Sequence, residues 1–137
     1  KQERSSLLDG VPAVMPALLI ARAYGERAAR AGFDWGDAAA VTEKVREEWG
    51  ELKAAATPEA MEAELGDLLF AIVNWARHLG VEPETALRRA NARFAARFRA
   101  MEARAEERGE GLAEMGPDQL EALWQSVKAD QRFSENG

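Results

Sequence analysis

The chain of 137 residues contains no cysteine and only one histidine, His78. The absence of cysteine excludes disulfide bonds and thiol catalysis, and it fits a reducing cytoplasm, where we expect the protein to reside. No apolar run approaches the roughly 18 residues that cross a membrane, because Pro16 and Arg22 interrupt the longest candidate at residues 17–20. We therefore predict no membrane partner.

Patterns typical of β-strands are also nearly absent, since no alternating run of Val, Ile, Thr or Tyr has a useful length. The sequence has no P-loop, no glycine-rich dinucleotide-binding motif and no Ser-His-Asp combination, so these chemistries are excluded. Its net charge of −6 argues against a nucleic-acid duplex as partner, because duplex binding needs a basic surface. Small phosphorylated ligands remain possible.

Helical periodicity between glycine and proline residues predicts an all-α protein with five helices. We expect them at about residues 16–30, from 37 or 38 to just before 57, at 58–79, over some 25 residues from 83, and as a short last helix from 117. A chain of this length can bury one core. We predict a polar lead or interdomain linker at residues 1–15 and a single helical domain at 16–137.

Two acidic clusters fall on consecutive predicted helices. Glu47-Glu48-Trp49-Gly50-Glu51 is followed, after twelve residues, by Glu64-Leu65-Gly66-Asp67. A helix advances about 100° per residue, so Glu48 and Glu51 lie on neighbouring parts of one surface, as do Glu64 and Asp67. The segment between the helices is long enough for the chain to turn back. Four carboxylates are therefore predicted to converge.

The position of Glu48 is the strongest indication of a metal site, because it falls inside the apolar stripe formed by Val41, Val45 and Leu52. Two like charges about 4 Å apart repel by roughly 4 kcal/mol at an effective dielectric constant of 20, and burial adds a further cost. A cation would offset both terms. The remaining acidic residues of these helices are interpreted as a solvated face: Glu43, Glu47, Glu59 and Glu62.

The types of ligand narrow the choice of metal. Oxygen ligands without cysteine or a nearby histidine suit Mg²⁺, with Mn²⁺ possible, rather than zinc or copper. A carboxylate-bridged di-iron centre needs Glu-x-x-His pairs, whereas the residue three before His78 is Trp75. We therefore expect Mg²⁺ as the cofactor.

Basic and aromatic residues on the last two helices have two interpretations. Arg93 and Arg97 are four residues apart and could reach one anion, or they could form surface ion pairs worth about 0.3 to 0.5 kcal/mol each. Trp124 and Lys128 have the same spacing, and core packing is the default explanation for Trp124. Spacing alone leaves these alternatives open.

The pattern Glu-Glu-x-x-Glu followed after twelve residues by Glu-x-x-Asp resembles that of MazG-type nucleoside triphosphate pyrophosphohydrolases, especially the C-terminal catalytic domain of two-domain members. The resemblance covers nearly the whole chain. It includes residues 6–12, 16–19, 32–35, 66–70, 74–79, 91–94 and 97–98.

The resemblance implies an all-α helical bundle completed by dimerisation and Mg²⁺-dependent hydrolysis of nucleoside triphosphates to monophosphate and pyrophosphate, as house-cleaning or nucleotide-pool control. It implies catalytic and metal-binding roles for Glu48, Glu51, Glu64 and Asp67, and substrate binding by Arg93, Arg97, Trp124 and Lys128. Arg93 stands where the family often has lysine, and this exchange replaces a point charge with a planar fork.

Two other functions compete with this one. A related phosphoribosyl-ATP or dUTP pyrophosphatase would share the metal site and differ in substrate. A non-catalytic dimerisation or regulatory module would keep the apolar stripes of the helices, but it would not need a carboxylate such as Glu48 inside a stripe.

Overall fold

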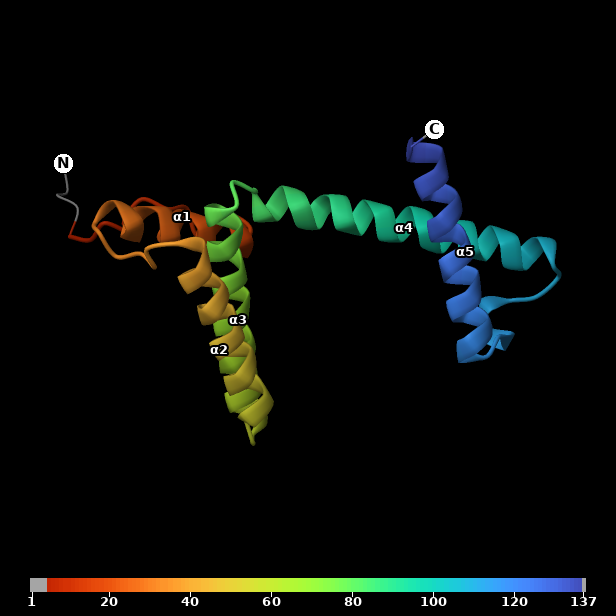
Figure 1. The fold of residues 1–137 in the computed structure, drawn as a ribbon, viewed down its shortest axis with the longest axis horizontal. Coiled ribbons are helices and arrows are strands. Elements are labelled where there is room, and N and C mark those ends of the chain that lie inside the picture. The colour runs from red at the N-terminus through yellow and green to blue at the C-terminus, as the bar shows by residue number, and fades with distance from the viewer. Residues whose placement is uncertain (1–4, 137) are drawn as a thin grey trace. The chain divides into compact units, whose positions relative to one another are not determined.

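The computed structural model describes residues 5–136, with side chains through residue 132, and in this range the chain is entirely helical, without a β-strand (Figure 1). The elements are α1 (Ala17–Arg30), α2 (Ala38–Ala54), α3 (Pro58–His78), α4 (Pro83–Glu107), the 3₁₀ helix η1 (Leu112–Glu114) and α5 (Pro117–Asn136). The predicted all-α fold is confirmed. Residues 1–4 of the predicted polar lead lie outside the described range. Within that range, none of the helices combines the length and the apolar character needed to cross a membrane.

Local hydrogen bonds fix the starts of α2 and α3. The Asp37 side chain accepts a bond from the Ala40 amide at 2.8 Å, and the Thr57 hydroxyl accepts one from the Ala60 amide at 3.1 Å. Each cap satisfies a backbone donor that has no partner within its own helix. Pro58 occupies the first turn of α3, where its missing N–H is not needed. These caps explain why both helices begin where the sequence predicts.

The last helix differs from its prediction. We expected a short helix, but α5 has 20 residues. The apolar side chains that mark its packed face end at Val127, whereas the chain contains no glycine or proline from residue 118 to 136. Nothing in that segment terminates the helix, so it continues beyond its packed face.

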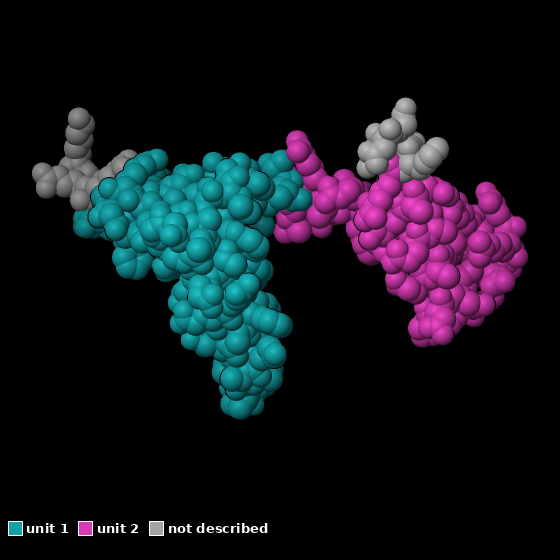
Figure 2. Space-filling view, in the orientation of Figure 1, with its two compact units in different colours: residues 1–86 teal, residues 87–137 magenta. Residues whose placement is uncertain are grey.

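The chain divides into two compact units, residues 1–86 and residues 87–137, coloured teal and magenta in Figure 2. In the first unit, α2 and α3 pack along each other and α1 contacts α3. The short link at residues 55–57 makes α2 and α3 an antiparallel pair. Val41, Ala71 and Val73 are buried here. The single-domain prediction stays a prediction.

The second unit has its own apolar core. Its buried members come from α4 and α5: Met101, Ala105, Leu123 and Val127. Leu112 and Met115 from the η1 region pack against them together with Leu120 and Trp124. The α5 members of this core follow a spacing of three and four residues, so the helix packs one apolar face against it.

Candidate metal centre

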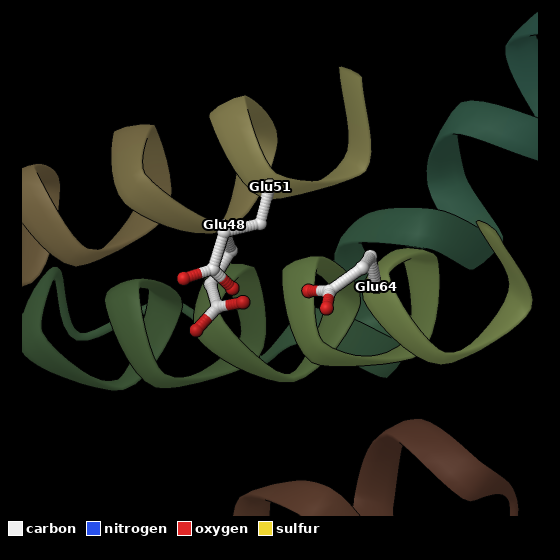
Figure 3. A group of neighbouring side chains, drawn as sticks. All are labelled: Glu48, Glu51 and Glu64. Carbon is white, nitrogen blue, oxygen red and sulfur yellow. The ribbon is translucent and has the colours of Figure 1, made fainter. Parts of the chain in front are cut away.

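Three of the four predicted carboxylates converge in the first unit. Glu48 and Glu51 extend from α2 toward Glu64 on α3, and one ligand oxygen from each lies within 4.8 Å of the others (Figure 3). Opposite ligands of an octahedral Mg²⁺ are about 4.2 Å apart, since each metal–oxygen bond is about 2.1 Å. Small side-chain movements would therefore let these three residues, here called the carboxylate group, share one ion.

Burial makes this group unusual for a set of surface acids. Glu48 is only 6% exposed, and Oε2 of both Glu48 and Glu64 is buried without a hydrogen-bond partner among the described residues. An ionised oxygen in this state is costly unless it is paired. A divalent cation would supply that partner, and the all-oxygen donor set suits a hard ion such as Mg²⁺. The predicted burial of Glu48 is confirmed.

Electrostatic effects within the group act in opposite directions on neighbouring carboxyls. Hydrogen bonding to Glu64 and repulsion by Glu48 raise the pKa of Glu51. A hydrogen bond from Lys44 outweighs burial and lowers the pKa of Glu48. The Lys44 ammonium lies 2.8 Å from Glu48 Oε1, one helical turn away on α2. Glu48 thus has one counter-ion already, whereas Glu51 and Glu64 face like charge.

Two other acidic residues lie outside the carboxylate group. Asp67 is exposed on α3, three residues after Glu64, and the structure does not bring it together with the other three. Glu47 is 58% exposed and 3.8 Å from the Lys44 ammonium, as expected for a residue of the solvated face. A metal-binding role for Asp67 stays a prediction.

The predicted substrate-binding residues lie in the second unit. The Arg97 Nε donates a hydrogen bond to Gln131 Oε1 at 3.0 Å, and its guanidinium carbon is 5.9 Å from the centre of the Trp124 ring. The Trp124 ring also packs against the Phe94 ring, and the two ring centres are 5.6 Å apart. Arg93 is exposed and Lys128 is half-buried. The structure therefore brings Arg97 and Trp124 together.

The structure also contains a second polar cluster, at the C-terminal end of α3, which the sequence did not indicate. This Asp34 network consists of Asp34, Asn74, Arg77 and His78. Asp34 Oδ1 accepts a hydrogen bond from Arg77 at 2.7 Å and lies 3.0 Å from His78 Nε2. Burial opposes the charge of Asp34, but these contacts outweigh it and lower its pKa to about 2. Arg77 also donates to the buried Asn74 side chain at 2.7 Å.

The sequence carries only a partial signal for these residues. Arg77 and His78 form a basic last turn of α3, which is a common way to end a helix. Nothing local connects them with Asp34, more than forty positions earlier. Lys44, by contrast, precedes Glu48 by four residues, and this spacing could have suggested their ion pair.

Fold and carboxylate group together define an all-α protein with a candidate site for a hard cation. No family model matches the chain. It is 43% identical over 127 residues to the nucleoside triphosphate pyrophosphohydrolase/pyrophosphatase MazG of Thermotoga maritima, covering 93% of this chain and 50% of that protein. It is 40% identical over 133 residues to the nucleoside triphosphate pyrophosphohydrolase of Escherichia coli K12, covering 93% and 51%.

A shorter match, 43% identical over 74 residues, is to the uncharacterized protein YabN of Bacillus subtilis and covers 54% of this chain and 15% of that one. The first two relatives, matched over 93% of the chain, are themselves named nucleoside triphosphate pyrophosphohydrolases, so the resemblance seen in the sequence is confirmed. The chain spans about half the length of the first two relatives.

Proposed function

We propose that this chain hydrolyses nucleoside triphosphates to monophosphate and pyrophosphate in a Mg²⁺-dependent reaction. The observation that carries the proposal is the convergence of Glu48, Glu51 and Glu64 in a chain about 40% identical to proteins named nucleoside triphosphate pyrophosphohydrolases. Nucleotide-pool control or house-cleaning in the cytoplasm is the role we assign to it.

The proposed roles of the carboxylates follow from their positions. Mg²⁺, when bound, would supply positive charge against the triphosphate. Glu48, Glu51 and Glu64 would hold the ion, with Asp67 as a fourth ligand, and a carboxylate oxygen not bound to the ion would orient the attacking water. Attack of water at the α-phosphorus breaks its bond to the bridging oxygen and releases pyrophosphate. The products together contain the atoms of the triphosphate and one water.

We also propose that Arg93, Arg97 and Lys128 bind the triphosphate and that Trp124 packs beside it. Contacts that strengthen as charge moves onto pyrophosphate change kcat, whereas contacts of constant strength change KM alone. Each alanine variant is expected to lose tenfold or more in kcat/KM, equivalent to about 1.4 kcal/mol. Arg99→Ala is the control, because Arg99 is another exposed arginine of α4. Normal kinetics in all three variants would reject these roles.

A homodimer completes the proposal, because α3 carries large apolar side chains that remain about half exposed. Four of them recur at helical spacing and are 41% to 48% exposed: Met61, Leu65, Leu69 and Ile72. A stripe of this kind is typical of an interface. Light scattering after gel filtration should give twice the mass of the chain. A monomer at micromolar concentration would contradict the dimer.

The decisive test of the reaction is a panel of canonical and modified nucleoside triphosphates, including dUTP, together with phosphoribosyl-ATP. Phosphorus NMR should detect monophosphate and pyrophosphate with Mg²⁺ and no turnover in excess EDTA. Selective hydrolysis of phosphoribosyl-ATP or dUTP would favour the related pyrophosphatases. Release of orthophosphate, or full activity in EDTA, would reject the mechanism, and no activity on any substrate would favour a non-catalytic module.

A further inference from the structure

Lys44 is the one basic side chain that ion-pairs with the carboxylate group in the described part of the chain. Its ammonium lies 2.8 Å from Oε1 of Glu48, and the lysine side chain is 30% exposed. The other oxygen of the same carboxylate, Oε2, is buried without a hydrogen-bond partner among the described residues. The two oxygens of Glu48 therefore have different surroundings.

This asymmetry restricts what Glu48 can do. A carboxylate with both oxygens free can rotate about its terminal bond and present either one, or both, to an ion. Here Lys44 donates to Oε1, whereas Oε2 has no hydrogen-bond partner among the described residues and is the oxygen left entirely free for a cation shared with Glu51 and Glu64. The pair spans one turn of α2, so the backbone of a regular helix holds the donor and the carboxylate in register.

We infer that Lys44 is a positioning residue that holds Glu48 by Oε1 and so reserves Oε2 for the divalent cation. The inference rests on the proposed function, because it takes the carboxylate group as the metal site. Hydrogen-bonded partners of ligating side chains orient the ligands, and their loss typically weakens metal affinity about 10- to 100-fold.

A purely electrostatic role for Lys44 predicts the opposite result. An ammonium next to a cation repels it, so removing the charge would tighten metal binding. The partial exposure of Lys44 allows water to screen this repulsion, whereas the hydrogen bond acts directly on a ligand carboxylate. The sign of the change in metal affinity therefore distinguishes the two roles.

The experiment measures Mn²⁺ binding to the full chain without nucleotide, using the electron paramagnetic resonance signal of free Mn²⁺. Lys44→Met and Lys44→Gln remove the charge and keep residues that favour helix. Lys44→Arg keeps a charged donor. Lys53→Met is the matched control, because Lys53 lies on the same helix and stacks on Trp49, with its ammonium 4.7 Å from the ring centre. Circular dichroism checks the helix content of each variant.

We expect the Kd for Mn²⁺ to rise tenfold or more in Lys44→Met, which has no donor, and to rise less in Lys44→Gln, whose amide can still donate to Oε1. The Kd should stay within about threefold of the wild type in Lys44→Arg and be unchanged in Lys53→Met. Unchanged or tighter binding in Lys44→Met would overturn the positioning role, as would failure of arginine to keep the affinity. A wild-type chain that does not bind Mn²⁺ would overturn the metal site itself, so the two failures are distinguishable.

Discussion

The carboxylate group and the Asp34 network both involve α3, and they differ in how their charges are balanced. In the carboxylate group three acids meet with Lys44 as their counter-ion, and two of the buried oxygens have no partner among the described residues. In the Asp34 network a single acid meets an arginine and a histidine. One cluster therefore has an excess of negative charge, and the other does not.

This difference separates a candidate binding site from a structural link. A cluster of like charges is destabilising by itself, so its persistence in a fold favours an external ligand as the balancing partner. Opposite charges that satisfy each other need no ligand, and here they tie the loop before α2 to the end of α3. Substitutions in the two clusters should therefore act on different properties of the protein.

The largest expected effect is on activity. Glu48→Gln, Glu51→Gln, Glu64→Gln and Asp67→Asn should each lower kcat/KM at least about a hundredfold, or about 2.7 kcal/mol, because each removes a proposed metal ligand. Without metal, Glu51→Gln and Glu64→Gln should raise the Tm, since they relieve repulsion. Glu48→Gln should lower it, because it breaks the ion pair with Lys44. Steady-state kinetics and thermal melts with and without Mg²⁺ measure both effects.

Glu43→Gln is the control for these substitutions, because the Glu43 side chain is 73% exposed on α2 and forms only a 3.7 Å surface pair with Arg46. Its activity and Tm should match the wild type. If all four variants of the proposed ligands unfold, or all four stay active, the carboxylate group has no catalytic role.

The difference between the clusters also explains how much the sequence could predict. The helices follow from periodicity and caps, which are local signals, and the burial of Glu48 follows from its place in an apolar stripe. Convergence of Glu48, Glu51 and Glu64 needed only one further assumption, that two consecutive helices turn back on each other. The carboxylate group was therefore predictable. The prediction also included Asp67, which the structure leaves outside the group.

The Asp34 network was not predictable in the same way. Its contacts join residues 43 and 44 positions apart, through a loop whose path no periodic pattern specifies. The length of α5 was missed for another reason, since the apolar pattern that we used to predict it ends before the helix does. Local signals thus predict elements and neighbouring contacts, whereas loop-to-helix contacts need the tertiary structure.

The second prediction concerns stability. Asp34→Asn should lower the free energy of unfolding by about 1 to 3 kcal/mol, because Arg77 and His78 lose a charged acceptor in a partly buried site. Urea denaturation measures the change. Metal affinity should not change, since Asp34 is not part of the carboxylate group. Glu62→Gln, at an exposed position of α3, should have no effect on either property. Wild-type stability in Asp34→Asn would mean that the network contributes nothing measurable.

The third prediction uses pH, because the two clusters respond with opposite signs. The pKa of Asp34 is lowered from 3.8 to about 2, so its contribution is complete above about pH 4 and is lost as the pH falls toward 2. The pKa of Glu51 is raised above 4.5, so its ionised form costs stability and that cost is relieved as the pH falls toward 4.5.

Urea denaturation of the metal-free protein between pH 7 and pH 2 tests both signs. Glu51→Gln should be more stable than the wild type at pH 7, and this difference should shrink toward pH 4.5. Asp34→Asn should be less stable than the wild type at pH 5, and the difference should shrink toward pH 2. Parallel curves for the wild type and both variants would show that neither carboxyl carries the proposed energy.

The smallest expected effect comes from two helical glycines, one beside each cluster. Gly66 lies between Glu64 and Asp67, and an added Cβ would meet no atom within 4 Å, so Gly66→Ala should raise the free energy of unfolding by about 0.5 to 1 kcal/mol. At Gly25, in α1, the added Cβ would lie 3.5 Å from both Arg77 Nε and Asn74 Oδ1. This is ordinary van der Waals contact, so Gly25→Ala should also be stabilising, but by less, because the methyl further desolvates polar atoms of the Asp34 network.

Gly32→Ala is the control of opposite sign, since Gly32 has a φ of +90° that alanine adopts only with strain. Urea denaturation of the three variants gives the order, and a Gly25→Ala protein as stable as Gly66→Ala would mean that the Asp34 network tolerates an apolar neighbour without cost.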